Sequence, residues 1–221
     1  MDNFQDRKLR TLAINKRLKK LFPRNNGTAL KHKNPWQLLV AVMLSAQCTD
    51  KKVNEVTNVL FKKYRTLTDY AKVSQKEFEK DVRPTGFYRN KAKNILSSAK
   101  KIKKEYGGSV PFSMDELLTL PGVARKTANV VLSNAFGKIE GIAVDTHVRR
   151  FAIRFELSAS KNPETIEKEI MLLLPKSEWF GFSNRLIEYG RTICPARKHD
   201  CSQHPLTKLY PKANRIWPRA H

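Results

Sequence analysis

The sequence has neither a long apolar run nor a recognisable export signal. No run approaches the roughly 18 apolar residues that a membrane-spanning helix needs. The first residues, Met1 to Gln5, lack the basic and apolar pattern of a signal peptide. These two absences argue against an integral membrane protein, and we expect no membrane partner.

Cysteine is also scarce. Cys48, Cys194 and Cys201 are the only three in the chain. An odd count without a secretory signal is typical of a reducing compartment. We therefore expect no structural disulfide.

Acidic residues are few in comparison with basic ones. The chain contains 43 Lys and Arg residues against 20 Asp and Glu residues, a formal net charge of +23. So large an excess repels itself in a compact chain, and a polyanionic partner is its simplest explanation. A solvated, Lys-rich surface of the kind that AT-rich genomes encode is the alternative. The balance of charge favours a nucleic-acid partner.

Alternating β patterns with hairpin turns are absent, which predicts an all-α protein. Helix starts are well marked. Asn34-Pro35-Trp36-Gln37 offers an N-cap with proline at the first helical position, and the apolar run Leu38 to Leu44 predicts a helix buried on most sides. Capping boxes are expected at Ser74 to Glu77 and at Ser113 to Glu116, and another helix is expected to start at Asn162-Pro163.

A basic helix is expected between residues 89 and 104. Its apolar stripe consists of Ala92, Ile95, Ala99 and Ile102. The remaining positions include Arg89, Lys91, Lys93, Lys100, Lys101, Lys103 and Lys104. A solvated face and a face turned toward phosphates are equally compatible with this charge run.

Residues 113–136 predict a helical hairpin. Residues 113–119 indicate a short helix, residues 120–123 a tight turn, and residues 124–136 a second helix. Gly122 can adopt a backbone conformation that other residues rarely reach, and it lets a phosphate approach closely. Free N–H groups and the dipole at the start of the second helix favour an anion there. A plain helical hairpin without a ligand is the alternative.

Three motifs resemble the endonuclease III family of the helix-hairpin-helix DNA glycosylase superfamily. They are Leu44-Ser45-Ala46-Gln47-Cys48-Thr49-Asp50, the stretch from Leu120 to Asp145, and Gly190-Arg191-Thr192-Ile193-Cys194-Pro195. The resemblance implies two all-α lobes with a DNA-binding cleft between them. A six-helix barrel lobe with the helix-hairpin-helix motif would span residues 28–138, and residues 1–27 and 139–221 would form the second helical lobe.

The resemblance implies a bifunctional DNA glycosylase and AP lyase of base-excision repair. Such an enzyme would act as a monomer on duplex DNA that carries a damaged (oxidised) pyrimidine or an abasic site, in the bacterial cytoplasm at the nucleoid. Lys126 falls at the family's catalytic lysine, whose neutral amine attacks C1′ of the sugar and permits β-elimination. Arg125, the helix N-terminus and partial burial are expected to lower the pKa of Lys126.

Asp145 falls at the family's second catalytic position. Its carboxylate would stabilise positive charge at C1′ or assist proton transfer. A plain helix N-cap is the alternative role for this residue. A monofunctional uracil or thymine mismatch glycosylase and a non-catalytic DNA-binding module are the competing functions, and the matched Lys126 and Asp145 argue against both.

The resemblance also assigns contacts with DNA. Extrusion of a base leaves a gap that side chains must fill. Gln47 matches the family's gap-filling glutamine and Phe87 its intercalating side chain, although core packing is an alternative for Phe87. The remaining DNA-binding residues would be Gly122, Val123, Ala124, Arg125, Thr127 and His147, and the pocket residues Ser45 and Asp50. Ala124 stands where the family often has glycine, and we expect the hairpin to tolerate it.

The family's iron–sulfur motif, C-x6-C-x2-C-x5-C, is incomplete in this chain. Its four positions hold Cys194, Cys201, His204 and Tyr210. A four-iron cluster generally requires four thiolates, so we expect no cofactor and no metal site. The plausible remnant ligands are Cys194, Cys201 and His204, and a zinc ion with His199 or Asp200 as fourth ligand is the alternative.

Overall fold

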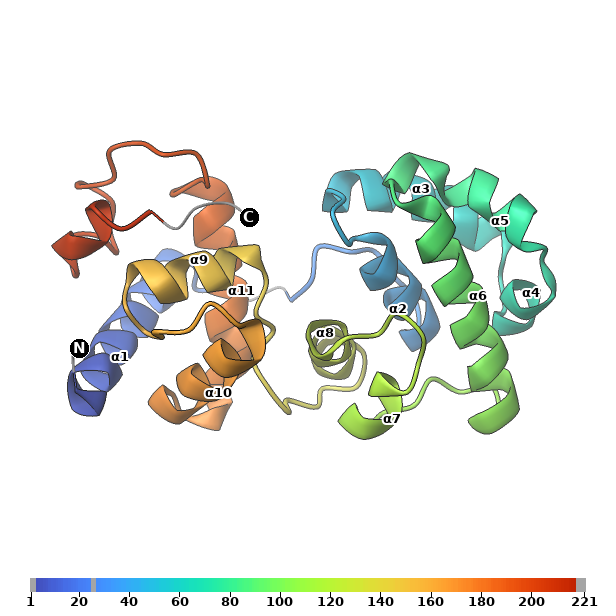
Figure 1. Cartoon of the computed structure of the whole chain (residues 1–221), viewed down its shortest axis with the longest axis horizontal. Helices are drawn as coiled ribbons and strands as arrows, with labels where there is room; N and C mark the ends of the chain where they lie inside the picture. The colour runs from blue at the N-terminus through green and yellow to red at the C-terminus, as the bar shows by residue number, and fades with distance from the viewer. Residues whose placement is uncertain (1–2, 25–26, 218–221) are drawn as a thin grey trace. The chain divides into compact units, whose positions relative to one another are not determined.

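The computed structural model describes residues 3–24 and 27–217. The chain divides into two compact units, one formed by Met1–Gly27 and Gly141–His221 and the other by Thr28–Glu140. Residues 1–2, 25–26 and 218–221, which belong to the predicted second lobe, lie outside the described residues. All the regular elements of the described residues are helices (Figure 1), which confirms the all-α prediction.

The unit Thr28–Glu140 is built around α2 (Figure 1). Its elements are α2 (Pro35–Leu44), α3 (Asp50–Lys63), α4 (Leu67–Lys72), α5 (Gln75–Val82), η1 (Arg83–Thr85), α6 (Tyr88–Glu105), α7 (Met114–Leu118) and α8 (Arg125–Ala135). Helix α2 packs against α3, α6 and α8, while α4 and α5 pack against α6. The unit therefore has its own hydrophobic core.

The N-terminus of α2 has the predicted cap. The side chain of Asn34 accepts a hydrogen bond from the Gln37 backbone N at 2.9 Å, and Pro35 occupies the first turn. Every residue from Trp36 to Leu44 is buried. A helix that is apolar on all sides must be surrounded by other elements, and the predicted burial of α2 is confirmed.

Other helix starts are also confirmed. The hydroxyls of Ser74 and Ser113 accept hydrogen bonds from backbone N–H groups three residues later. Neither predicted capping box is complete among the described residues, because the return bond from the acidic side chain to the backbone of the capping residue does not form. A complete capping box, which we did not predict, forms between Thr66 and Asp69 at the start of α4. In the other unit, Asn162 caps the predicted helix that follows it. Local capping chemistry thus sets many helix boundaries.

Helix α6 carries the predicted apolar stripe, whose four residues are fully buried. The expected basic face is correct for most of its members, but Lys91 is buried with 6% of its surface exposed. Lys91 lies on the helical face of Ile95, Ser98 and Ile102, at positions i+4, i+7 and i+11. Its place on that face explains why it leaves the solvated side.

The unit formed by Met1–Gly27 and Gly141–His221 has a second core. Its elements are α1 (Phe4–Leu21), α9 (Thr146–Arg154), α10 (Pro163–Leu173), η2 (Lys176–Glu178), α11 (Trp179–Thr192) and η3 (Pro211–Asn214). Helix α11 packs against α1 and α9. No helix in the described part of the chain combines the length and the apolar character needed to cross a membrane.

Candidate functional site

The turn between α7 and α8 depends on Gly122. The Val123 backbone N donates to the Leu120 carbonyl at 3.1 Å, and this bond closes the turn. Gly122 has a φ of +76°, in the region that favours glycine. A Cβ atom at position 122 would also lie 2.6 Å from Nδ2 of Asn94. Both the backbone and the close approach of Asn94 therefore require glycine, as the sequence predicted.

Helix α8 starts without a side-chain cap. Its N-cap is Ala124, with a φ of −93°, and no side chain caps the first N–H groups of the helix. This φ is ordinary for an alanine, so the methyl group causes no backbone strain. Because the side chain of Val123 is buried, this residue can contact a ligand only through its backbone. The start of α8 thus offers backbone donors to an external acceptor.

Lys126 lies in the first turn of α8 and is exposed. The predicted partial burial of this side chain is wrong, because the buried residues of α8 begin only at Ala128. Arg125 and Thr127 are half-buried beside it. In this structure the amine of Lys126 is open to solvent and to any ligand that approaches the turn.

Gln47, Phe87 and Gly122 line one pocket, although they come from three separate segments. Its volume is about 190 Å³, and its other lining residues are Met43, Ala46, Asn90, Lys91 and Asn94. The turn after α2, the turn before α6 and the turn before α8 therefore meet at one place. The structure brings together three of the residues for which the sequence predicted DNA contacts.

Gln47 and Phe87 share an unusual backbone conformation. Their φ angles are +52° and +46°, and Glu156 is the one other non-glycine residue with positive φ in the described ranges. Such a conformation costs on the order of 1–3 kcal/mol and is concentrated at functional sites. Phe87 is 65% exposed, so the alternative of core packing is wrong. Both side chains are held out of the core at the cost of strain.

Lys91 is a residue of this site that the sequence did not reveal. Its Nζ donates to the Leu44 carbonyl at 2.8 Å and to the Thr85 carbonyl at 2.7 Å. Burial lowers the pKa of Lys91. Leu44 precedes Gln47 by three residues and Thr85 precedes Phe87 by two. One ammonium group thus joins the two strained segments. The sequence did hold a signal for this burial, because Lys91 stands four residues before Ile95 on the apolar face of α6.

Ser45 and Asp50 flank the turn after α2 but do not line the pocket of Gln47. The hydroxyl of Ser45 donates to the Val42 carbonyl at 2.8 Å and so completes the end of α2. Asp50 is half-buried in the first turn of α3. The role of these two residues toward a substrate stays a prediction.

Asp145 is the N-cap of α9, in the other unit. Its Oδ1 accepts hydrogen bonds from the backbone N of His147 and of Val148, both at 2.9 Å. Within the described ranges its Oδ2 accepts none. The carboxylate is half-buried and fixed through one oxygen. The alternative role of Asp145 as a helix cap is therefore correct. Capping uses only Oδ1, so Oδ2 can still contact a ligand.

His147 packs over α11. A Cβ at position 190 would collide with Nδ1 of His147, which explains the glycine there. Nη2 of Arg150 lies 3.4 Å from this Nδ1, and a guanidinium only donates, so Nδ1 accepts. Burial lowers the pKa of His147, with Arg150 and Arg191 acting in the same direction against Asp145. The neutral ring presents its Nε2–H as a donor.

The loop after α11 gathers the remnants of the cysteine motif. One ligand atom each of Cys194, Cys201 and His204 lies within 4.8 Å of the others, and both thiols are buried. The expectation of no metal site is therefore not supported. Folding brings together residues that are ten positions apart in the sequence.

The surroundings of these thiols differ from those of a four-cysteine site. Arg154 of α9 donates from Nη1 to the sulfur of Cys194 at 3.1 Å and from Nη2 to the sulfur of Cys201 at 2.8 Å. Tyr210, at the fourth position of the motif, donates its hydroxyl to Glu156. Two sulfurs face a cation, and the fourth side chain has a different partner.

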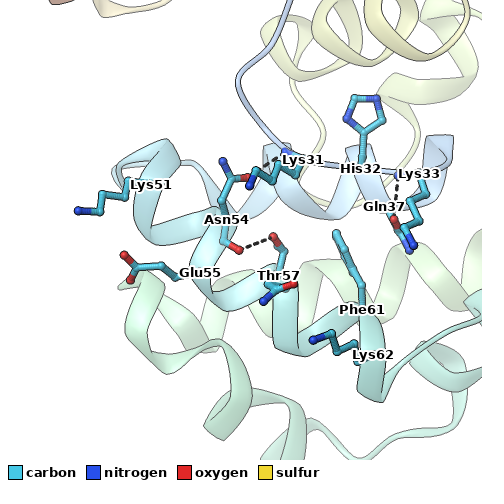
Figure 2. Close-up of a pocket in the computed structure, with 11 residues that line it drawn as sticks. Lys31, His32, Lys33, Gln37, Lys51, Asn54, Glu55, Thr57, Phe61 and Lys62 are labelled. Carbon is cyan, nitrogen blue, oxygen red and sulfur yellow. Dashed lines mark hydrogen bonds between the residues drawn. The ribbon is translucent and has the colours of Figure 1, made fainter.

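A larger pocket lies elsewhere in the unit Thr28–Glu140 (Figure 2). Its volume is about 800 Å³, and none of the predicted site residues lines it. The backbone N of Lys31 donates to Asn54 and that of Lys33 to Gln37, so the wall beside α3 is well fixed. Lys51 and Lys62 contribute further positive charge. We interpret it as an open basic groove separate from the predicted site residues.

Comparisons with known proteins relate this chain to a family. Residues 40–176 match the family described as HhH-GPD superfamily base excision DNA repair protein. Endonuclease III of Synechocystis sp. is 49% identical over 196 residues, covering 89% of this chain and 89% of its own. Endonuclease III of Bacillus subtilis is 49% identical over 181 residues, covering 81% of this chain and 82% of its own.

A solved structure adds a similarity of fold. It is that of a trapped covalent intermediate between endonuclease III and DNA, with a TM-score of 0.89 and 43% sequence identity. The match covers 97% of this chain and 99% of that one. The chain therefore belongs to the HhH-GPD superfamily of base excision DNA repair proteins, in the family of endonuclease III.

Proposed function

We propose that this protein is a bifunctional DNA glycosylase and AP lyase that removes oxidised pyrimidines from duplex DNA as a monomer. The observation that carries the proposal is the position of Lys126. It is an exposed amine in the first turn of α8, beside uncapped N–H groups and directly after the Gly122 turn. Backbone donors there hold a phosphate, while the amine reaches the neighbouring sugar.

The chemistry of Lys126 proceeds in two stages. Its neutral amine forms a bond to C1′ while the bond from C1′ to the base breaks, and the base leaves with a proton. The bond from C1′ to O4′ then breaks and O4′ takes a proton, which leaves an iminium that acidifies the protons on C2′. Loss of one such proton breaks the bond from C3′ to oxygen, and the electron pair leaves with the 3′ phosphate.

Asp145 supplies negative charge to this reaction. Its Oδ1 is fixed by two backbone donors of α9, whereas Oδ2 is available for the sugar or for a proton. A carboxylate held in this way stabilises the positive charge that develops at C1′ without reorganising. His147 adds a neutral N–H donor toward the DNA.

Gln47 and Phe87 fill the gap that base extrusion leaves in the duplex. Both are exposed, both have positive φ, and both line the same pocket. An exposed phenylalanine can stack between bases, which stabilises an opened duplex. Lys91 holds their two segments together, so the two side chains enter the DNA as one unit.

The family's four-iron cluster is not part of the proposal. Only two of the four motif positions carry thiols, Arg154 donates to both, and Tyr210 is bonded to Glu156. A cluster would need further thiolates. We place the reaction in the bacterial cytoplasm, at the nucleoid.

Lys126→Gln tests the function directly. The variant is expected to lose strand cleavage and borohydride trapping by a factor of about 10³ or more on duplexes that contain an oxidised pyrimidine or an abasic site. Lys103→Gln is the matched control, because it removes one exposed lysine from α6 and is expected to keep both activities. Undiminished trapping by Lys126→Gln would refute the assignment. Base release by the wild type without trapping would point to a monofunctional enzyme, and binding alone to a non-catalytic module.

A further inference from the structure

Four potential metal ligands follow one another closely in the loop after α11. They have the spacing Cys194-x4-His199-x-Cys201-x2-His204. Three of them, Cys194, Cys201 and His204, already place a ligand atom within 4.8 Å of one another. Two thiols and two imidazoles in one short loop form a donor set that zinc prefers.

His199 is oriented toward the cluster. Its Nε2 lies 3.9 Å from the sulfur of Cys194. Its Nδ1 lies 2.6 Å from the Arg197 carbonyl, and a carbonyl only accepts, so Nδ1 carries the proton. The lone pair is then on Nε2, on the side of Cys194. A carbonyl that fixes the tautomer of a histidine in this way is typical of metal-bound imidazoles.

The other candidate for the fourth ligand is already bonded elsewhere. Asp200 is exposed, and its Oδ1 accepts from the Ser202 backbone N at 2.9 Å and from Asn214 at 3.2 Å. Its Oδ2 accepts from the Ser202 hydroxyl at 3.1 Å. In contrast, Nδ1 of His204 is buried without a hydrogen-bond partner among the described residues.

We propose that Cys194, His199, Cys201 and His204 bind one zinc ion. With zinc–sulfur bonds of about 2.3 Å and zinc–nitrogen bonds of about 2.0 Å, neighbouring ligand atoms of a tetrahedron are about 3.3–3.8 Å apart. The distance of 3.9 Å from Cys194 to His199 is close to this value. The ligand atoms of Cys194, Cys201 and His204, which lie within 4.8 Å of one another, need to approach by about 1.3 Å at most.

Arg154 does not bind the ion itself but donates hydrogen bonds to two of its ligands. Its guanidinium is fully buried and donates to both sulfurs and to the Ala213 carbonyl, and it lies 3.9 Å from the ring centroid of Trp217. Among the residues that the structure describes, no carboxylate forms an ion pair with it. Zinc-bound thiolates would accept its N–H donors and balance its charge. The ion would thereby connect the loop, through Arg154, to α9 and to η3.

Metal analysis of the purified protein tests the site. Protein expressed in medium that contains both zinc and iron is expected to carry about one zinc ion per chain. Cobalt substituted for zinc is expected to give the visible bands of a tetrahedral site and the ultraviolet band of thiolate coordination. A yellow-brown protein with iron would overturn the proposal, as would a folded protein that binds neither zinc nor cobalt, because the thiols and imidazoles would then be joined only by hydrogen bonds.

Two pairs of variants assign the ligands. Cys201→Ala is expected to lose the zinc while Cys48→Ala, which changes the one cysteine outside the loop, retains it. His199→Ala is expected to lose the zinc while Asp200→Asn retains it. Circular dichroism confirms that each variant is folded, and the cobalt spectrum of the wild type stands even if a variant is not. Retention by His199→Ala together with loss by Asp200→Asn would refute the assigned fourth ligand.

Discussion

The turn before α8 and the loop after α11 both follow a helix, but their polar groups have opposite surroundings. The turn leaves the first N–H groups of α8 uncapped and the amine of Lys126 exposed. The loop buries Cys194 and Cys201 and surrounds their sulfurs with donors from Arg154. Polar groups without a partner in the protein indicate an external ligand, whereas buried and bonded ones indicate an internal structural role.

The same contrast holds for the relation to the family. The turn matches the family pattern at Gly122 and Lys126, the residues that the proposed function places against DNA. The loop departs from the pattern at His204 and Tyr210. A structural cross-link can be made by other means, because it only has to hold the same segments together. The comparison predicts that changes in the turn and its pocket affect catalysis, and that changes around the loop affect stability.

The largest expected effect on catalysis beyond that of Lys126 is at Asp145. Asp145→Asn keeps an oxygen that can cap α9 but removes the charge, so cleavage is expected to fall by a factor of about 10²–10³. The free energy of unfolding is expected to change by less than about 1 kcal/mol, because asparagine is a good N-cap. Single-turnover kinetics and urea unfolding measure the two effects. Normal cleavage by Asp145→Asn, with loss only in Asp145→Ala, would leave capping as the sole role.

The loop is expected to give the opposite result. Arg154→Met removes the donors to two sulfurs and to the Ala213 carbonyl, and the free energy of unfolding is expected to fall by about 2–4 kcal/mol. Urea unfolding measures it. The fraction that stays folded is expected to cleave at the normal rate. Slow cleavage by fully folded Arg154→Met would contradict the expectation that the loop affects stability and not catalysis.

Lys91 tests the connection between structure and function within the unit Thr28–Glu140. Lys91→Met removes two buried hydrogen bonds, so the free energy of unfolding is expected to fall by about 2 kcal/mol. Lesion cleavage is expected to fall as well, because the segments of Gln47 and Phe87 lose their common support. Lys93→Met, an exposed lysine of the same helix, is the control for charge. Equal stability and equal lesion cleavage in the two variants would show that Lys91 does not support the segments of Gln47 and Phe87.

Phe87 separates lesion processing from general DNA binding. Phe87→Ala is expected to reduce processing by about tenfold, from a stacking contribution of about 1–3 kcal/mol. Nonspecific binding is expected to be unchanged, and so is stability, since the side chain is 65% exposed. Fluorescence anisotropy with undamaged duplex provides the comparison. Equal losses in processing and in binding would indicate simple destabilisation.

The smallest expected effect is the pH dependence that His147 causes. Its pKa in the folded protein is below the ordinary value, mainly because of burial, so the unfolded chain binds more protons. Stability due to His147 is therefore present above about pH 6.5 and is lost as the pH falls below that value. Unfolding between pH 5 and pH 7.5 measures it, with His147→Gln expected to flatten the slope. An unchanged slope would assign the dependence to other groups.

Much of the local structure was predictable from the sequence. Caps at Asn34, Ser74 and Ser113 and the stripe of α6 are set by hydrogen bonds and periodicity within a few residues. The role of Gly122 was also predictable, because a tight turn limits which residues fit at that position. The burial of Lys91 and the exposure of Lys126 were predicted wrongly, because burial depends on what packs against a helix from distant parts of the chain.

The sequence by itself determined an all-α protein, a basic character and a glycine turn before a lysine. The tertiary structure decided which groups remain available. It left Oδ2 of Asp145 without a partner among the described residues, held Gln47 and Phe87 in strained positions, and turned His199 rather than Asp200 toward the thiol of Cys194. Capping and periodicity act between neighbours in sequence, whereas exposure, strain and side-chain direction result from contacts between segments that only folding brings together.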